Sequence, residues 1–273
     1  MKDFNKYTFN ILKSPVDNRD FLLESIYPEQ VELPKTWDMR PMLPPVKDQG
    51  RQGTCSAQTA ACMKEYQERL DVGLSEALSP QFVYNLRQNQ TSAGMIPRDT
   101  MDILNKIGIV KETEYPYNSK TKITTAMKKI ALKYIISGYA QIGTIDSLKK
   151  ALFANGPCYI AFPVYNGNNL EFWKQEFPNQ PSMGGHAVSV VGYTEDAFII
   201  RNSWSAAWGE GGYTFYKFID WGRHWECWTT LDADSNPVGL QRKLALSRAD
   251  RTEKLGFFKK MFRAKAKKCS CGH

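Results

Sequence analysis

Three segments in the second half of the chain are rich in β-branched and aromatic residues, and they limit the fold more than any other feature. Residues 186–193 (HAVSVVGY) and 197–204 (AFIIRNSW) are separated only by residues 194–196. Such runs favour strands, and a three-residue connection favours a hairpin. A third run of the same character covers residues 211–219. This half of the chain is therefore predicted to form an antiparallel sheet.

The first half has a helical pattern instead. Residues 55–72 contain no proline and many good helix formers. Two shorter candidate helices cover residues 100–107 and 145–155, the second with Thr144 as its N-cap. Each candidate is followed by a glycine that can end a helix, namely Gly73, Gly108 and Gly156. Helices first and antiparallel strands later predict an α+β chain with two subdomains and a cleft between them.

The positive charge of the chain is concentrated at its end. The 273 residues carry a formal charge of +8, but residues 241–273 hold eleven Lys and Arg against two Asp and Glu, a local charge of +9. The rest holds 25 basic and 26 acidic groups, a net −1. A content of 42% hydrophobic and 12% aromatic residues excludes disorder throughout. We therefore divide the chain into an arm (1–33), a body (34–240) and a basic tail (241–273).

The sequence predicts neither a membrane span nor a secretory signal. No segment approaches eighteen uninterrupted apolar residues, and the N-terminus has no apolar run of signal-peptide length. The cysteines are too sparse for a disulfide framework in a chain of this length: Cys55, Cys62, Cys158, Cys227, Cys269 and Cys271. We therefore expect a cytoplasmic or other reducing compartment.

Cys55 lies where the long helical pattern begins. A thiol in the first turn of a helix faces unpaired backbone N–H groups and the positive end of the helix dipole, which favour the thiolate. The alternative is a small buried apolar residue, as free cysteines usually are. Cys62 cannot bridge to Cys55 on one helix, because roughly 10.5 Å would separate their Cα atoms, against a limit of about 7 Å.

The predicted hairpin brings His186 close to Asn202 and Trp204. With Tyr193 facing Ala197 across the turn, the numbers of paired positions sum to 390. In that register His186 faces Trp204, and Asn202 is its diagonal neighbour on the same face of the sheet. A diagonal pair lies about 7–8 Å apart between backbones, within reach of an imidazole and an amide. A half-buried sheet face with a satisfied histidine is the alternative interpretation.

Residues 31–216 resemble the papain family of cysteine peptidases in several segments that occur in the family's order. The nucleophile region is LPKTWDMR followed by PPVKDQGRQGTCSA, and the histidine and asparagine regions are GGHAVSVVGY and RNSWSAAWGEGGY. Three connecting stretches also match: LSPQFVYNLR, GIVKETEYPY and LKKALFANGP. Cys55 precedes His186 by 131 residues and Asn202 by 147, within the family's usual range. The resemblance implies a helical left half, an antiparallel β-barrel-like right half, and an active site between them.

The resemblance also implies a role for individual residues. Cys55 would be the nucleophile, His186 its general base and acid, and Asn202 the group that orients the imidazole. Gln49 and the backbone N–H of Cys55 would form the oxyanion hole. Trp204 would shield the hydrogen bond between His186 and Asn202 from water.

Four residues match positions along the family's substrate cleft and are expected to contact substrate. They are Gly53, Gly94, Trp204 and Trp208. Three other positions depart from the family pattern: Gln52 replaces a cysteine, Ser56 an aromatic residue and Ser205 a glycine. These departures are typical of disulfide-poor microbial or viral members rather than of secreted lysosomal cathepsins, and they leave the shape of the cleft open.

The resemblance implies hydrolysis of peptide bonds in protein or peptide substrates through an acyl-enzyme thioester. It implies no cofactor and no metal ion, and we expect a monomer. Two other functions could use the same residues. One is acyl transfer to an amine, as in transglutaminase-like enzymes, and the other is non-catalytic binding on the same fold.

The arm occupies the position of a prosegment but is too short for the helical prodomain of larger relatives. We expect it to lie over the cleft and lower activity, as in a zymogen; the alternative is an arm that simply packs on the body. In the tail, Leu255, Phe258, Met261 and Phe262 share one helical face among lysines, which suits an anionic membrane surface. Docking of that face on the body is the alternative. Nucleic-acid binding is not expected, because no recognisable nucleic-acid-binding fold is present.

Overall fold

The computed structural model describes residues 4, 6–25 and 32–232. The expectations for the basic tail, including its apolar face and terminal cysteines, lie outside these residues. The helices of the described part are α1 (Cys55–Val72), α2 (Pro80–Asn85), α3 (Pro97–Lys106), α4 (Thr125–Ala131) and α5 (Ile145–Asn155). The strands are β1 (Trp37–Asp38), β2 (Ile136–Gln141), β3 (Cys158–Val164), β4 (Gly184–Tyr193), β5 (Ala197–Arg201), β6 (Tyr213–Lys217) and β7 (Glu226–Asp232). The chain is therefore mixed α+β, as its sequence predicts.

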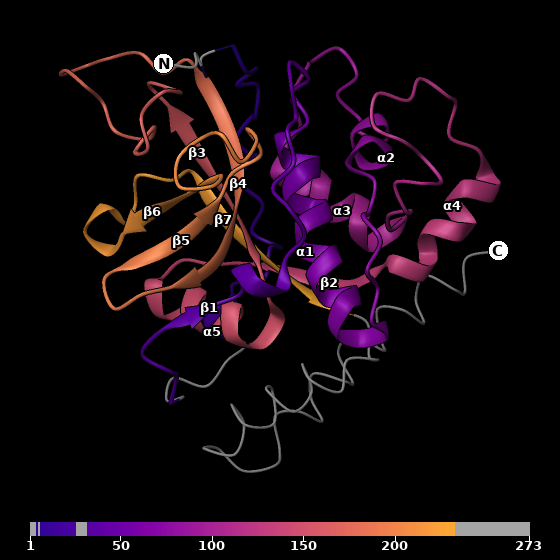
Figure 1. The fold of residues 1–273 in the computed structure, drawn as a ribbon, viewed down its shortest axis with the longest axis horizontal. Coiled ribbons are helices and arrows are strands. Elements are labelled where there is room, and N and C mark those ends of the chain that lie inside the picture. Colours follow the sequence, from indigo (N-terminus) through magenta and orange to yellow (C-terminus); the bar gives the residue numbers. More distant parts are fainter. Residues whose placement is uncertain (1–3, 5, 26–31, 233–273) are drawn as a thin grey trace.

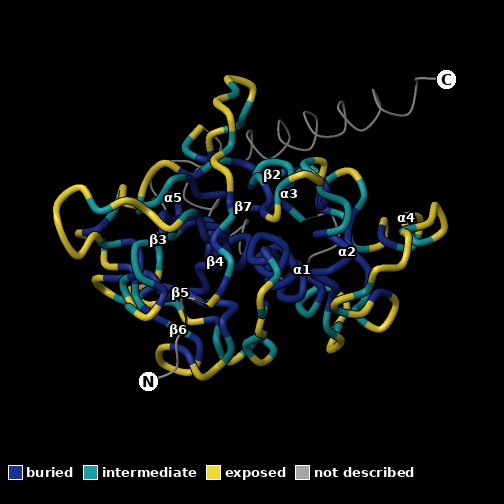
Figure 2. The backbone as a smooth tube through the Cα atoms, turned by 90° about the horizontal axis from the view of Figure 1, so that it is seen from above, coloured by how far each residue is buried: buried dark blue, intermediate teal, exposed yellow. Residues whose placement is uncertain are grey.

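Helix α1 lies at the boundary between the helical half and the sheet half of the molecule. Figure 1 shows α2, α3 and α4 on one side of it and strands β3 to β6 on the other. The helix is buried from Cys55 to Glu68, and Figure 2 shows it as part of the dark blue centre. It ends as predicted at Gly73, whose φ of +69° is left-handed and whose N–H donates to the carbonyl of Glu68.

The other two predicted helices also form. Helix α5 has the predicted bounds, and Thr144 caps it by accepting a hydrogen bond from the N–H of Ser147 at 3.1 Å. Helix α3 begins at Pro97, three residues before the predicted start, because proline at the first helical position fits the helix without losing a hydrogen bond. Within the described part of the chain, no helix has the length and apolar character needed to cross a membrane.

The strands form one antiparallel sheet whose order is β2-β7-β3-β4-β5-β6. Strand β1 pairs with β4 off this path. Among the described residues the order has two ends and does not return on itself, so the sheet is open rather than a closed barrel. Every residue of β3 and β5 is buried, which explains why these strands lack the alternation of a half-exposed sheet.

The hairpin of β4 and β5 forms with one correction to the predicted register. Ser189 pairs with Arg201 and Val190 with Ile200, positions that sum to 390 as predicted. At the turn, however, Tyr193 pairs with Phe198 rather than with Ala197, because the register shifts by one residue between Val190 and Tyr193. The shift lies where β1 pairs with β4, at Gly192 and Tyr193.

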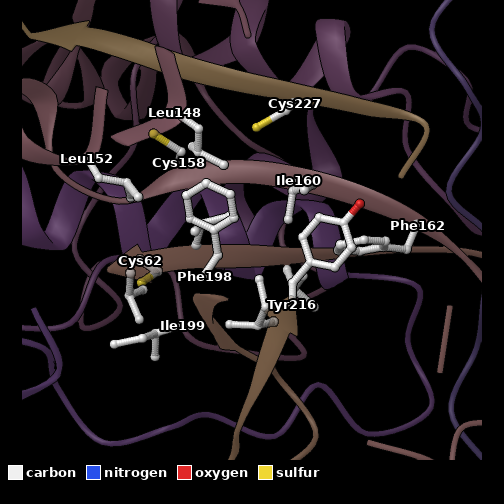
Figure 3. Close-up of a cluster of buried hydrophobic side chains, with 14 of the residues drawn as sticks. Cys62, Leu148, Leu152, Cys158, Ile160, Phe162, Phe198, Ile199, Tyr216 and Cys227 are labelled. Atoms are coloured by element: carbon white, nitrogen blue, oxygen red, sulfur yellow. The ribbon is translucent and has the colours of Figure 1, made fainter. Parts of the chain in front are cut away.

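The largest core fills the sheet half of the molecule and includes residues of α5 and of strands β3 to β6. Figure 3 shows Leu148 and Leu152 of α5 facing apolar side chains of β3 and β5, among them Ile160 and Phe198. A second core joins α1 to α2 and α3 through small α1 residues such as Ala57, Ala60 and Ala61. Small side chains let neighbouring elements approach closely, so α1 is fixed on both sides. The first residue of α1 therefore has a defined place relative to the sheet.

Candidate active site

Cys55 is the first residue of α1 and is fully buried. Thr54 occupies the N-cap position, but its side chain makes no capping hydrogen bond and instead contacts the hydroxyl of Tyr117 at 2.7 Å. The side chain of Thr54 therefore accepts no hydrogen bond from the N–H groups of the first turn. Burial raises the pKa of the thiol to about 11, although hydrogen bonds from the backbone N–H groups of Ala187, Ser56 and Cys55 itself act to lower it.

His186 lies on β4, and Asn202 follows the last residue of β5. The imidazole Nε2 and the amide Oδ1 of Asn202 are 2.8 Å apart. Oδ1 also accepts the backbone N–H of Ser203 at 2.7 Å, which fixes the oxygen on this side of the amide. Since an amide oxygen only accepts, Nε2 must carry the proton, and Nδ1 of a neutral ring holds a lone pair. Nδ1 is buried and has no hydrogen-bond partner among the described residues.

Trp204 covers the imidazole. The rings of His186 and Trp204 are stacked with their centroids 4.4 Å apart, and Phe172 approaches the imidazole edge-on at 5.7 Å. Burial lowers the pKa of His186 to about 4, against a smaller opposite effect of its hydrogen bond to Asn202. The predicted proximity of His186, Asn202 and Trp204 is thus present in the structure.

Both the backbone and the side-chain amide of Gln49 are fixed by hydrogen bonds. Its N–H donates to the carbonyl of Ser203 at 2.9 Å, and its side-chain Oε1 accepts from the hydroxyl of Ser203 at 2.8 Å. The Nε2 group donates to the carbonyl of Gln52 at 3.0 Å, which uses one of its two protons. Ser203 therefore orients both Asn202 and Gln49. Sequence reasoning missed it, although it lies directly between Asn202 and Trp204.

The predicted substrate-side residues occupy different places. A Cβ on Gly53 would lie 2.1 Å from the carbonyl oxygen of Ala93, and a Cβ on Gly94 would lie 1.4 Å from that of Asn10. Both positions therefore require glycine, and Gly94 faces the arm. Trp208 is buried, with its indole N–H donating to the carbonyl of Gly167 at 3.1 Å and its ring against Trp204. Trp208 supports Trp204 and is not exposed to a ligand in this state.

The arm crosses the site and hydrogen-bonds to both of its walls. Ile11 donates its N–H to the carbonyl of Gly185 at 3.0 Å, and Leu12 donates to the carbonyl of Met95 at 3.1 Å. Asn10 forms a parallel bridge with Gly185, the residue before His186. In Figure 1 the indigo N-terminal segment runs along the boundary between the sheet and the helices. The arm thus joins the start of β4 through a single isolated bridge.

Three side chains of the arm cover the candidate catalytic residues. Tyr7 stacks on Trp204 at 5.4 Å, and Phe9 contacts His186 edge-on at 6.2 Å. Ile11 belongs to the same buried apolar cluster as Cys55. All three arm residues are buried, so the thiol and imidazole are closed off from solvent. Tyr7, Phe9 and Ile11 alternate with Thr8 and Asn10, a period-2 pattern that indicates an extended segment with one buried face but not the site that it covers.

Further along, the arm is fixed by polar contacts. Asp20 forms an ion pair with Arg98 of α3, and the backbone N–H of Ser14 donates to Glu226 at 2.8 Å. The Glu24 carboxylate accepts from the N–H of Gly143 at 2.8 Å, just before α5. These anchors lie outside the segment that covers Cys55, so the covering segment and its attachment are separate parts of the arm.

Comparison with known proteins places this geometry in a family. The family model described as papain family cysteine protease matches residues 33–225. A cathepsin L-like peptidase of Aedes aegypti is 31% identical over 205 residues, which cover 69% of this chain and 60% of that protein. The chain thus spans about three fifths of the length of that curated relative.

Solved structures give the same result. Xylellain, a cysteine protease from Xylella fastidiosa, superposes with a TM-score of 0.74 at 28% identity and covers 85% of this chain and 99% of its own. Digestive procathepsin L 3 of Tenebrio molitor larval midgut gives a TM-score of 0.62 at 22% identity, over 84% of this chain and 76% of its own. At that identity the second likeness concerns the fold alone.

Proposed function

We propose that this chain, which belongs to the papain family of cysteine proteases, hydrolyses peptide bonds with Cys55 as its nucleophile. The observation that carries the proposal is the contact between Nε2 of His186 and Oδ1 of Asn202, from which the tautomer of His186 is inferred. Its Nε2 proton is committed to Asn202, and that oxygen is fixed by Ser203. The lone pair on Nδ1 is then available to take the proton of a thiol.

The reaction follows from these positions. The Cys55 thiol transfers its proton to Nδ1 of His186, and the thiolate adds to the carbonyl carbon of a peptide bond. Gln49 Nε2 and the N–H of Cys55 donate to the resulting oxyanion. The imidazolium then protonates the leaving amine as the C–N bond breaks, which leaves a thioester on Cys55. His186 next takes a proton from water, whose oxygen attacks the thioester and releases the carboxylate and the thiol.

We further propose that the arm keeps the enzyme inactive. With the arm in place, substrate cannot reach Cys55, because Ile11 and Phe9 occupy the space beside the thiol and imidazole. The arm also suppresses the chemistry, because burial raises the pKa of the Cys55 thiol and lowers the pKa of His186, so both groups stay neutral. The Tenebrio structure, which shares this fold, is that of a procathepsin.

The test is peptide hydrolysis by four forms of the protein. Fluorogenic peptide libraries are incubated with the full chain, with a chain lacking residues 1–13, and with the shortened chain carrying Cys55→Ala or Asn202→Ala. We expect the shortened chain to cleave peptides faster than the full chain. Cys55→Ala should abolish cleavage, whereas Asn202→Ala should leave measurable activity, because an orienting group is less essential than a nucleophile.

Two results would contradict the proposal. Undiminished turnover by the Cys55→Ala protein would remove Cys55 as the nucleophile. Products in which an added amine replaces the new carboxyl group, in the presence of a primary amine and water, would indicate acyl transfer instead. Mass spectrometry of the products distinguishes these results, because hydrolysis adds one water to the cleaved bond.

A further inference from the structure

Three buried hydroxyl groups next to the first turn of α1 are joined by hydrogen bonds, and we call them the hydroxyl chain. The hydroxyl of Ser56 is 2.7 Å from Oγ1 of Thr100 and 2.8 Å from the phenol oxygen of Tyr159. All three side chains are buried. The mechanism above uses none of them, and a buried polar group is costly unless it is hydrogen-bonded.

The direction of each hydrogen bond in the hydroxyl chain follows from the one that Thr100 donates at its end. The Thr100 hydroxyl donates to the carbonyl of Ile96 at 3.2 Å, so its oxygen can accept the proton of Ser56. The oxygen of Ser56 can then accept the proton of Tyr159. Each hydroxyl donates once, and none is left without a partner. Burial raises the pKa of Tyr159 well above its usual value, so the phenol stays a donor at any ordinary pH.

Of the hydrogen bonds within the hydroxyl chain, only one joins the helical half of the molecule to the sheet half. Ser56 is in α1 and Thr100 is in α3, which pack together in the helical half. Tyr159 is in β3, where it pairs with Ser189 of β4, three residues after His186. The bond between Tyr159 and Ser56 therefore links the helix that begins with Cys55 to the strands that hold His186.

We propose that the hydrogen bond from Tyr159 to Ser56 is a positioning contact that sets the sulfur of Cys55 against the imidazole of His186. Tyr159 and Ser56 are thus positioning residues for the proposed peptidase reaction, and the inference rests on that proposed function. A hydrogen bond is directional, so it resists sliding of the two halves past one another more than apolar packing does. The Tyr159 ring packs in the same cluster as Cys55, so a shift here would reach the thiol directly.

The bond also affects the electrostatics of the thiol. The backbone N–H of Ser56 donates to the Cys55 sulfur from the helix, and that of Ala187 donates from β4. Stabilisation of the thiolate by both donors requires the two halves to keep their relative position. Because the Ser56 side chain is held from β3, its backbone N–H keeps its direction toward the sulfur.

The test compares three single variants that remove hydroxyls at matched places, together with the double variant of Tyr159→Phe and Ser56→Ala. Tyr159→Phe and Ser56→Ala each break the contact between the two halves. Thr100→Val removes a hydroxyl of the same chain but leaves that contact in place, and serves as the control. The second-order rate of Cys55 alkylation by iodoacetamide is measured from pH 5 to pH 10 in the full chain and in the chain lacking residues 1–13, because the arm covers the thiol in the full chain.

We expect Tyr159→Phe and Ser56→Ala each to move the alkylation profile about one pH unit toward alkali, which is about tenfold slower labelling at pH 7. The double variant should be no slower than either single variant, because both changes break one bond. Thr100→Val should stay within about twofold of the parent, although its Tm falls by a similar amount. A merely structural role would lower Tm in all three variants without moving the profile.

Several outcomes decide the matter. Profiles of Tyr159→Phe and Ser56→Ala that coincide with that of Thr100→Val would overturn the positioning role while leaving the peptidase intact. If one variant fails to fold, the other still carries the comparison, because each removes a different end of the same bond. A chain lacking residues 1–13 that alkylates at another cysteine and hydrolyses no peptide would instead overturn the proposed function itself.

Discussion

Removal of the covering segment should make Cys55 reactive. A chain that begins at residue 14 lacks Tyr7, Phe9 and Ile11, which cover the thiol and imidazole. It keeps Asp20, whose ion pair with Arg98 fixes the rest of the arm. The change therefore opens the site while retaining the anchors of the arm on the body.

The expected size of the effect follows from the thiol. Burial raises the pKa of Cys55 from 9.0 to about 11, so the thiolate fraction at pH 7 falls from about 10⁻² to about 10⁻⁴. Since the thiolate is the reactive form, exposure alone should accelerate alkylation about 100-fold. Direct access of the reagent and a charged His186 both act in the same direction, whereas the remaining burial of Cys55 by residues such as Met63 and Ala187 acts in the opposite one.

The assay is the second-order rate of iodoacetamide labelling at pH 7, with the site mapped by mass spectrometry. A full chain carrying Val16→Ser is the control, because Val16 belongs to the arm but is 93% exposed and is not one of the three residues that cover Cys55 and His186. Circular dichroism verifies that the shortened chain is folded. A folded, shortened chain that labels at Cys55 within threefold of the full chain would refute the argument.

Two further predictions concern the oxyanion and the effect of acid. Gln49→Ala should lower kcat about 10²–10³-fold with a smaller change in KM, because the Nε2 group donates to charge that develops only in the transition state; an equal change in both constants in a steady-state assay would contradict this. Burial lowers the pKa of His224 from 6.5 to about 4, so the unfolded chain binds more protons between those values and stability is lost as the pH falls through that window. Urea unfolding at pH 7 and pH 4.5 should show that His224→Gln loses about 2 kcal/mol less than the parent on acidification, and equal losses would refute the assignment.

Local signals in the sequence predicted the parts of the fold that depend on neighbouring residues. The end of α1 at Gly73 and the cap of α5 at Thr144 follow from residues within one turn of the helix. The register near Ser189 followed from hairpin geometry, whereas the shift between Val190 and Tyr193 lies where β4 also pairs with β1, which is about 150 residues earlier. A pairing with so distant a segment leaves no local pattern.

The candidate site shows the same division. The nearness of His186 to Asn202 could be predicted because both lie in one hairpin. The dual role of Ser203 could not, because it depends on Gln49, a residue 154 positions away. The path of the arm also depends on remote partners, since Ile11 hydrogen-bonds to Gly185 and Leu12 to Met95. The alternation of Tyr7, Phe9 and Ile11 with polar residues indicates an extended segment, but it does not identify the part of the body that this segment contacts.

The central claim is that Cys55 forms a covalent acyl intermediate during peptide hydrolysis. The most direct measurement is rapid acid quenching of the chain lacking residues 1–13 during turnover of an activated peptide ester, followed by mass spectrometry of its peptic fragments. Acid preserves a thioester, so we predict a fragment containing Cys55 that is heavier by the mass of the acyl group. Turnover of the ester with no acyl group on Cys55, or with the acyl group on a different residue, would contradict the claim.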